Sequence, residues 1–178
     1  KFDKIYLGGC YMKKIILLFL TIYTFSFSIR DFNGINWGDS KENLSILFSN
    51  LKKEPSINEN VNIFSVKNPK ENIKKYEFYL QNNALNKIRV VFDKESIGKR
   101  ELQQIYNQLT TTIGVPVLKL PIYKEIDNLT LKGNTLKFVP DTQTLIYFTG
   151  IDTINELGKM TDSNLYLDYI PSQNEYIF

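Results

Sequence analysis

The acidic side chains are the main candidates for catalysis in this sequence, because the usual nucleophile–base pairs are missing. The chain contains no histidine, and its single cysteine is Cys10, which excludes serine–histidine and cysteine–histidine sites. Two carboxylates alone can hydrolyse a glycosidic bond. The candidates for such a pair are Glu77, Asp93, Glu95 and Asp127. Their positions are equally typical of solvated charges on strands and loops, so we assign no catalytic residue and predict a protein that is not an enzyme.

Metal and cofactor chemistry has few suitable ligands here. Zinc and copper are usually bound by histidine and cysteine, and this sequence has no histidine and a single cysteine, Cys10. Calcium binds carboxylate oxygens, and Asp141, Asp152 and Asp162 are candidates, but they lack the spacing of an EF-hand loop. The sequence also has none of the glycine-rich phrases that cradle phosphates. We therefore predict no metal and no cofactor.

Aromatic side chains offer a different chemistry, the stacking of sugars or peptides. The candidates for a stacking platform are Tyr76, Tyr79, Tyr147, Tyr166, Tyr169 and Tyr176. Such tyrosines also fill the cores and edges of β-rich domains with their hydroxyls at the rim. We single out Trp37, Tyr79 and Tyr147 as binding or structural anchors. Trp37, the sole tryptophan, stands just before a helix N-cap, where it can hold the incoming chain onto the first helix.

Residues 12–28 have the pattern of a secretory signal peptide. Met12 is followed by two lysines, an apolar run over 15–27, and small residues at Ser26 and Ser28 that suit cleavage. An uncleaved anchor is the weaker interpretation, because a membrane-spanning helix needs roughly 18 or more apolar residues. The sequence therefore predicts a periplasmic or secreted protein, with no stable membrane span once the signal is cleaved.

Residues 1–11 are predicted to be a non-native upstream extension, because Leu7-Gly8-Gly9 can be encoded by a purine-rich ribosome-binding sequence. Cys10 completes a phrase that resembles a lipobox, but a lipobox must follow the apolar run and this one precedes it. From residue 29 onward, basic and acidic side chains are equal in number. This balance argues against nucleic acid as a partner, since phosphate binding needs clustered Lys and Arg.

The remaining sequence alternates between helix and strand patterns. An apolar stripe with helical spacing predicts a helix over 40–51, and a second stripe predicts one over 96–113 that ends at Gly114. Alternation over 75–92 around Asn82-Asn83 predicts a β-hairpin. Weaker patterns predict strands at 61–66, 129–132, 135–139 and 144–149, a short helix around 154–157, and an extended piece at 165–169.

These elements predict an α+β fold in which two main helices pack on one face of an antiparallel sheet. We assign residues 29–160 to this domain and 161–178 to a C-terminal tail. A shift of 58 residues superposes the two helical stripes and also the hairpin 75–92 onto later strands, which suggests a tandem α-β-β-β pseudo-repeat. The domain has no cysteine, so its stability must come from a packed core rather than from disulfides.

The opening of the domain resembles a group of small exported bacterial α+β domains of unknown function. That group has a phrase like F-x-G-I-x-W-G-x-S before its first helix, matched here by Phe32, Gly34, Ile35, Trp37, Gly38 and Ser40. The aromatic strand at 76–80, the Asn82-Asn83 turn and Gly114-Val115-Pro116 also fit. The resemblance implies an antiparallel fold, loosely similar to β-lactamase-inhibitor-like envelope proteins. It implies no activity and no catalytic residue.

Together these observations favour an exported, non-enzymatic binding or interaction module of the bacterial cell envelope. Its partner would be another envelope or extracellular protein, which meets an exposed sheet face or a strand edge. Two alternatives stay open. The chain is a carboxylate-dependent glycan hydrolase if two carboxylates face each other in a cleft, or a carrier of a small apolar ligand if a cavity lies between sheet and helices.

Overall fold

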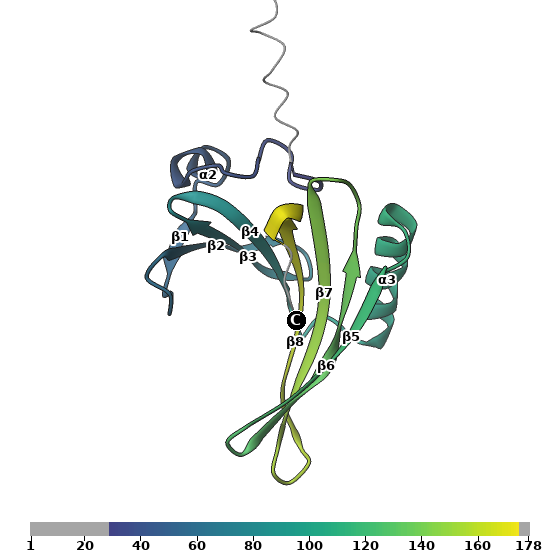
Figure 1. Ribbon diagram of the computed structural model, residues 1–178. Helices are drawn as coiled ribbons and strands as arrows, with labels where there is room; N and C mark the ends of the chain where they lie inside the picture. Colours follow the sequence, from purple (N-terminus) through teal and green to yellow (C-terminus); the bar gives the residue numbers. More distant parts are fainter. Residues whose placement is uncertain (1–28, 175–178) are drawn as a thin grey trace, which may run out of the picture.

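The computed structural model describes residues 29–174, so the predictions for residues 1–28 and for Tyr176 lie outside the described residues. The described residues form one eight-stranded antiparallel sheet, two α-helices and a short 3-10 helix. Figure 1 shows the helices at two ends of this curved sheet. The predicted α+β class with an antiparallel sheet is confirmed.

The strands follow each other in two runs of four, one run after each α-helix. The first run is β1 (Lys52–Glu54), β2 (Val61–Lys70), β3 (Ile73–Gln81) and β4 (Ala84–Phe92); the second is β5 (Leu118–Ile126), β6 (Leu129–Phe138), β7 (Thr144–Asn155) and β8 (Met160–Pro171). Their order across the sheet is β1-β2-β3-β4-β8-β7-β6-β5. The last strand of each run therefore lies at the centre, and β4 pairs with β8.

The hairpin β3–β4 is the element that the sequence predicts best. Asn82 and Asn83 both have positive φ, at 51° and 61°, as a two-residue hairpin turn requires. The register is Tyr79↔Lys87 but Leu80↔Leu85, so Asn86 is an extra residue in β4. This β-bulge keeps the apolar residues of both strands on one face, because a one-residue slip would turn Ile88 to the other face.

The second run of strands is longer and more regular than predicted. Strand β5 was not predicted; it contains Pro121, which an edge strand tolerates because no neighbour needs its missing N–H. The short helix predicted around 154–157 is wrong, because β7 continues to Asn155 and turns back into β8. Asn155 Oδ1 accepts hydrogen bonds from the N–H groups of Leu157 and Lys159 in this turn. Figure 1 shows the β5–β6 and β7–β8 hairpins extending away from the helices.

Most of the segment 161–178 that we assigned to a C-terminal tail belongs to the sheet. Strand β8 lies between β4 and β7, and its residues Leu167, Tyr169 and Ile170 are buried. Residues Ser172–Asn174 follow as the 3-10 helix. The boundary at residue 160 therefore coincides with the beginning of a central strand.

The two α-helices begin and end close to the predicted positions. Helix α2 (Lys41–Leu47) begins after Ser40, whose Oγ accepts a hydrogen bond from Asn43 N, and it ends earlier than predicted because the chain turns into β1. Helix α3 (Lys99–Ile113) begins at Gly98, whose N–H donates to Glu101, and ends at Gly114 with a φ of 92°. Among residues 29–174, no helix is long and apolar enough to cross a membrane.

One face of the sheet carries the core, and we call it the core face. The buried side chains at its centre form one row across six neighbouring strands: Phe64, Phe78, Ile88, Tyr169, Ile146 and Phe138. Leu44 of α2 belongs to the same cluster, and Ile105 and Leu109 of α3 pack against it. Alternation along each strand directs the intervening residues to the opposite face, which we call the polar face.

Candidate functional site

The polar face carries a continuous row of side chains that contrasts with the buried row behind it. This polar row crosses the same six strands, one residue away from the core row: Ser65, Glu77, Arg89, Asp168, Tyr147 and Lys137. Neighbours in antiparallel strands lie close enough for their side chains to interact. The sheet register therefore brings together residues that are far apart in the sequence.

An ion pair between the two central strands anchors the polar row. Arg89 Nε and Nη2 donate to Asp168 Oδ1 and Oδ2, each at 2.7 Å. The guanidinium carbon lies 3.9 Å from the centre of the Tyr166 ring, close enough for a cation–π interaction. Burial works against the charge of Arg89, but the Asp168 carboxylate raises the pKa of the guanidinium above its ordinary value. Arg89 is thus fixed in position by one carboxylate and one ring.

A second cluster surrounds Tyr79 on β3. The Tyr79 hydroxyl donates to Glu77 Oε2 at 2.7 Å, and Lys75 Nζ lies 2.6 Å from Glu77 Oε1. Lys87 Nζ from β4 lies 3.8 Å from the centre of the Tyr79 ring. The Arg89 guanidinium carbon lies 6.0 Å from the same ring, so the two clusters are contiguous. These residues are half-buried, which leaves part of each side chain open to solvent.

The electrostatics of these groups suit binding better than proton transfer. Burial raises the pKa of Tyr79, and the hydrogen bond to Glu77 raises it further. Burial also raises the pKa of Glu77, but Lys75, Tyr79 and Arg89 outweigh it and the net pKa lies below the ordinary value. Neither group changes protonation near neutral pH, where a general acid or base must do so. Burial lowers the pKa of Lys87.

The three predicted anchors lie in different places. Tyr79 is at the centre of the site, and Tyr147 is a buried member of the polar row. Trp37 lies outside the site, in the loop before α2, where it packs against the core and its Nε1 donates to Thr144 Oγ1 at 3.4 Å.

The other described tyrosines of the predicted platform are divided between the two faces. Tyr166 lies on the polar face against Arg89, whereas Tyr76 and Tyr169 are buried in the core cluster. The Tyr169 hydroxyl donates to Asp31 at 3.1 Å, and burial raises the pKa of this tyrosine.

The predicted carboxylate candidates lie on separate elements. Glu77 is in the middle of β3, and Asp93 follows β4, where its side chain accepts from Glu95 N and Ser96 Oγ. Glu95 is exposed in the loop before α3, and Asp127 lies in the β5–β6 turn with a φ of 52°. The positions of Asp93 and Asp127 in loops are thus explained by the preference of aspartate for turns.

The calcium candidates are also dispersed. Asp141 accepts from the N–H groups that begin β7, Asp152 accepts from Ser163, and Asp162 pairs with Lys94. Within residues 29–174, no group of three or more acidic, histidine or cysteine residues is arranged to hold a metal ion.

Sequence reasoning named Tyr166 as a candidate for the stacking platform but missed Lys87, Arg89 and Asp168. The alternation of β4 with Ile88 and Val90 was a usable signal, because it places Lys87 and Arg89 on the face that carries Tyr79. Asp168 had no such signal, because it meets Arg89 through a strand pairing between residues 79 positions apart.

No protein-family model, curated protein or solved structure matches this chain, so the site is interpreted from its own geometry.

Proposed function

We propose that this protein is an exported, non-enzymatic binding module of the bacterial cell envelope, and that it engages a protein partner through the polar face. The observation that carries the proposal is the fixed, half-exposed array of Tyr79, Lys87, Arg89 and Tyr166. Arg and Tyr are enriched among the residues that dominate protein interfaces. Side chains already held in place lose little conformational entropy when a partner binds.

The chemistry of the polar face supports a protein surface as the ligand. It offers aromatic rings, several cations and hydrogen-bonded carboxylates within one patch, which matches the mixed composition of an interface. Nucleic acid is a poorer fit, because Arg89 is already paired with Asp168 and Lys75 with Glu77. Phosphate binding needs cations that are free to replace counterions.

A glycan hydrolase finds less support on the same face. Asp168 accepts two hydrogen bonds from Arg89, and the pKa of Glu77 lies below its ordinary value. A carboxylic acid that protonates a glycosidic oxygen needs a raised pKa instead.

Export rests on the pattern of residues 12–28, with cleavage after Ser28. The proposal places the domain in the periplasm or the extracellular space. Cell fractionation with N-terminal sequencing tests this part, and the expected mature protein begins at Ile29. Recovery of the uncleaved chain from the cytosol would exclude export.

We also infer that both helices cover the core face and that the domain is a tandem repeat. The support is the strand order, in which β1-β2-β3-β4 is followed by β8-β7-β6-β5, so that each run of four starts at an edge and ends at the centre. The repeating unit inferred from the structure is one helix followed by four strands, whereas the sequence suggested one helix followed by three strands. The 58-residue shift aligns the helices but sets β3 against β6, whereas the strand order sets β3 against β7.

Site-specific photo-cross-linking in the native bacterium tests the polar face. A benzoylphenylalanine side chain at Lys87 should give a discrete adduct with one partner, and the matched control at exposed Gln104 on α3 should not. The substitution Tyr166→Ala should weaken the Lys87 adduct, because it removes the ring that holds Arg89. Equal adducts from both positions, or none from Lys87, would contradict binding through this face.

A further inference from the structure

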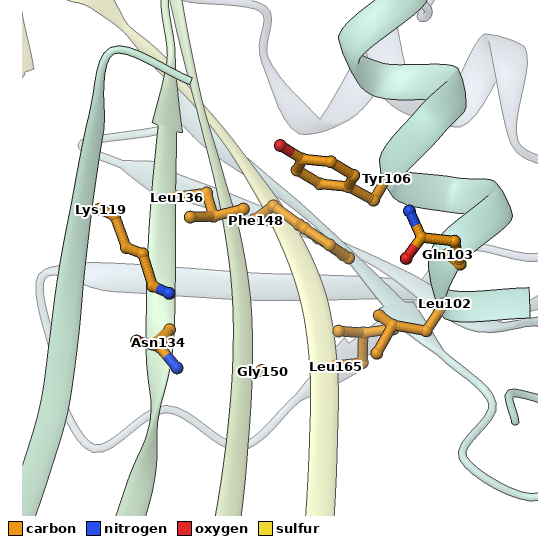
Figure 2. Close-up of a pocket in the computed structure, with 9 residues that line it drawn as sticks. All are labelled: Leu102, Gln103, Tyr106, Lys119, Asn134, Leu136, Phe148, Gly150 and Leu165. Carbon is orange, nitrogen blue, oxygen red and sulfur yellow. The ribbon is translucent and has the colours of Figure 1, made fainter. Parts of the chain in front are cut away.

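A groove lies on the other side of the molecule, between α3 and the strands of the second run. Figure 2 shows Leu102, Gln103 and Tyr106 of α3 facing Leu136, Phe148 and Leu165 of the sheet, with Lys119 and Asn134 beyond them. This pocket has a volume of about 320 Å³. Its floor is apolar; Lys119 and Asn134 lie on the strand side, and Gln103 lies across from them on α3.

The pocket continues into a second hollow along the same strands. The two share Leu102, Asn134, Gly150 and Leu165, so they form one groove that passes beneath Leu102. The second hollow measures about 450 Å³ and adds the apolar side chains of Ile97 and Met160, together with polar ones such as Lys99, Asp152 and Ser163. The groove is thus apolar beneath Leu102 and polar towards its far end.

The groove exists because α3 packs loosely over this end of the sheet. None of the residues of α3 is fully buried, and Leu102 remains 39% exposed although it faces the strands. Gly150 lines both hollows and leaves the floor without a side chain where they join. A Cβ atom at Gly150 would meet only Leu165 Cδ1, at an ordinary contact distance of 3.6 Å. Space for a ligand at this junction therefore depends on a glycine.

The charge at one end of the groove is positive. Within residues 29–174 the Lys119 ammonium forms no ion pair, and Asn134 on the neighbouring strand can donate hydrogen bonds. At the other end the cations Lys94 and Lys99 are matched in number by two carboxylates, that of Asp162, which pairs with Lys94, and that of Asp152. An anionic head group therefore fits at Lys119, with its apolar part directed towards Ile97.

We propose that this groove binds a single long-chain fatty acid, with the carboxylate at Lys119 and the acyl chain beneath Leu102. The apolar floor takes a hydrocarbon chain because burial removes its surface from water. The Lys119 ammonium, with the Asn134 amide on the same side of the pocket, selects an anionic head group over an uncharged one. This site lies on the core face, so its outcome is independent of a partner at the polar face.

The first experiment closes the groove at its junction. Binding of dansyl-undecanoic acid to the full chain is followed by fluorescence, with wild type compared with Gly150→Ala and Gly150→Leu. The leucine should place a side chain in the groove and weaken binding at least tenfold, whereas alanine should weaken it less. The apolar run at 15–27 is present in every variant, so the difference between variants reports on the groove. Far-UV circular dichroism checks that each variant is folded.

The second experiment tests the head-group end with a matched pair of lysines on β5. Dodecanoate and dodecanol compete with the probe on wild type, Lys119→Gln and Lys124→Gln; Lys124 lies on the same strand but does not line the groove. Wild type and Lys124→Gln should prefer the acid, and Lys119→Gln should lose roughly three- to tenfold in affinity for the acid alone. Folded Gly150→Leu protein that binds like wild type, or an acid preference unaffected by Lys119→Gln, would overturn the proposal.

Discussion

The core row and the polar row cross the same six strands one residue apart, yet their side chains differ in chemistry. The core row consists of buried aromatic and aliphatic side chains that belong to one hydrophobic cluster with Phe32 and Leu44. The polar row holds charges and hydroxyls: Arg89 pairs with Asp168 across strands, and Glu77 bonds to Tyr79 and Lys75 along β3. The main hydrophobic cluster thus lies on one face, and the other face holds charged groups in fixed positions.

Adjacent residues on β3 give the sharpest test of this division. Phe78 is completely buried on the core face, and its ring lies 5.1 Å from that of Phe48. Phe78→Ala should lower the free energy of unfolding by ~3–5 kcal/mol, because it removes buried surface and leaves a cavity. Tyr79→Ala on the polar face should cost only about 1 kcal/mol, since it removes a half-exposed ring, its contacts with Lys87 and Arg89, and one hydrogen bond to Glu77. Urea denaturation measures both, and equal costs would contradict the division.

Removal of the Arg89–Asp168 ion pair is expected to have the next largest effect on stability. This pair belongs to the polar row, so its loss would show that the polar face also contributes to folding. The Asp168 side chain is 6% exposed and that of Arg89 26%, so this pair is well shielded from water. Asp168→Ala should cost about 2–4 kcal/mol, because it leaves the Arg89 guanidinium half-buried without its carboxylate.

The double variant Arg89→Met/Asp168→Leu is the control for that ion pair. It should cost less than Asp168→Ala alone, because no uncompensated charge remains after both groups are replaced. If the double variant is instead the less stable of the two in urea denaturation, then the pair itself supplies stability, and the polar face contributes more to folding than the comparison implies.

Two glycines on neighbouring strands, Gly133 and Gly150, differ in how much space their surroundings leave for a side chain. A Cβ atom on Gly133 of β6 would lie 2.0 Å from the carbonyl oxygen of Gly150, so the chains must move apart to accept it. Gly133→Ala should therefore cost about 1–3 kcal/mol. Gly150→Ala, directed to the core face, has room and should change the free energy of unfolding by no more than about 0.5 kcal/mol. Thermal unfolding of both variants decides whether steric contact or the loss of glycine flexibility dominates.

Local patterns in the sequence predicted the elements that depend on local physics. The β3–β4 hairpin follows from alternation and from Asn82-Asn83, and α3 follows from its apolar stripe and Gly114. The spacing of Ile154 and Leu157 led to the wrong prediction of a short helix. Two apolar residues three positions apart are also compatible with a strand end followed by a turn. Strand β5 was missed because Pro121 is unfavourable in any strand except an edge.

The site itself was only partly predictable for a related reason. Tyr79 was identified from its residue type, but its role depends on Lys87, which reaches it through the register set by the bulge at Asn86. Arg89 and Asp168 meet because β8 enters the sheet beside β4. Single-sequence periodicity carries no information on which distant strands pair, so this contact could not be derived before the structure.

The smallest expected effect concerns the pH dependence of Glu77 in the polar row. The pKa of this carboxyl is lowered in the folded protein, so the charged form stabilises the fold above the unfolded-state pKa of about 4.3. That contribution is lost as the pH falls through the folded-state value. Glu77→Gln should thus be less stable than wild type by no more than about 1 kcal/mol at pH 7, and this difference should shrink below about pH 4.

Lys75→Met is the companion variant for Glu77, because it removes the cation at 2.6 Å but keeps the Tyr79 hydrogen bond. Its cost should fade over the same acidic range, since protonation of Glu77 removes the charge that Lys75 attracts. Urea midpoints measured from pH 7 to pH 3 give both curves. A difference that stays constant with pH in both variants would mean that Glu77 is held by packing and hydrogen bonding alone. The polar row would then resemble the core row more closely than its charges suggest.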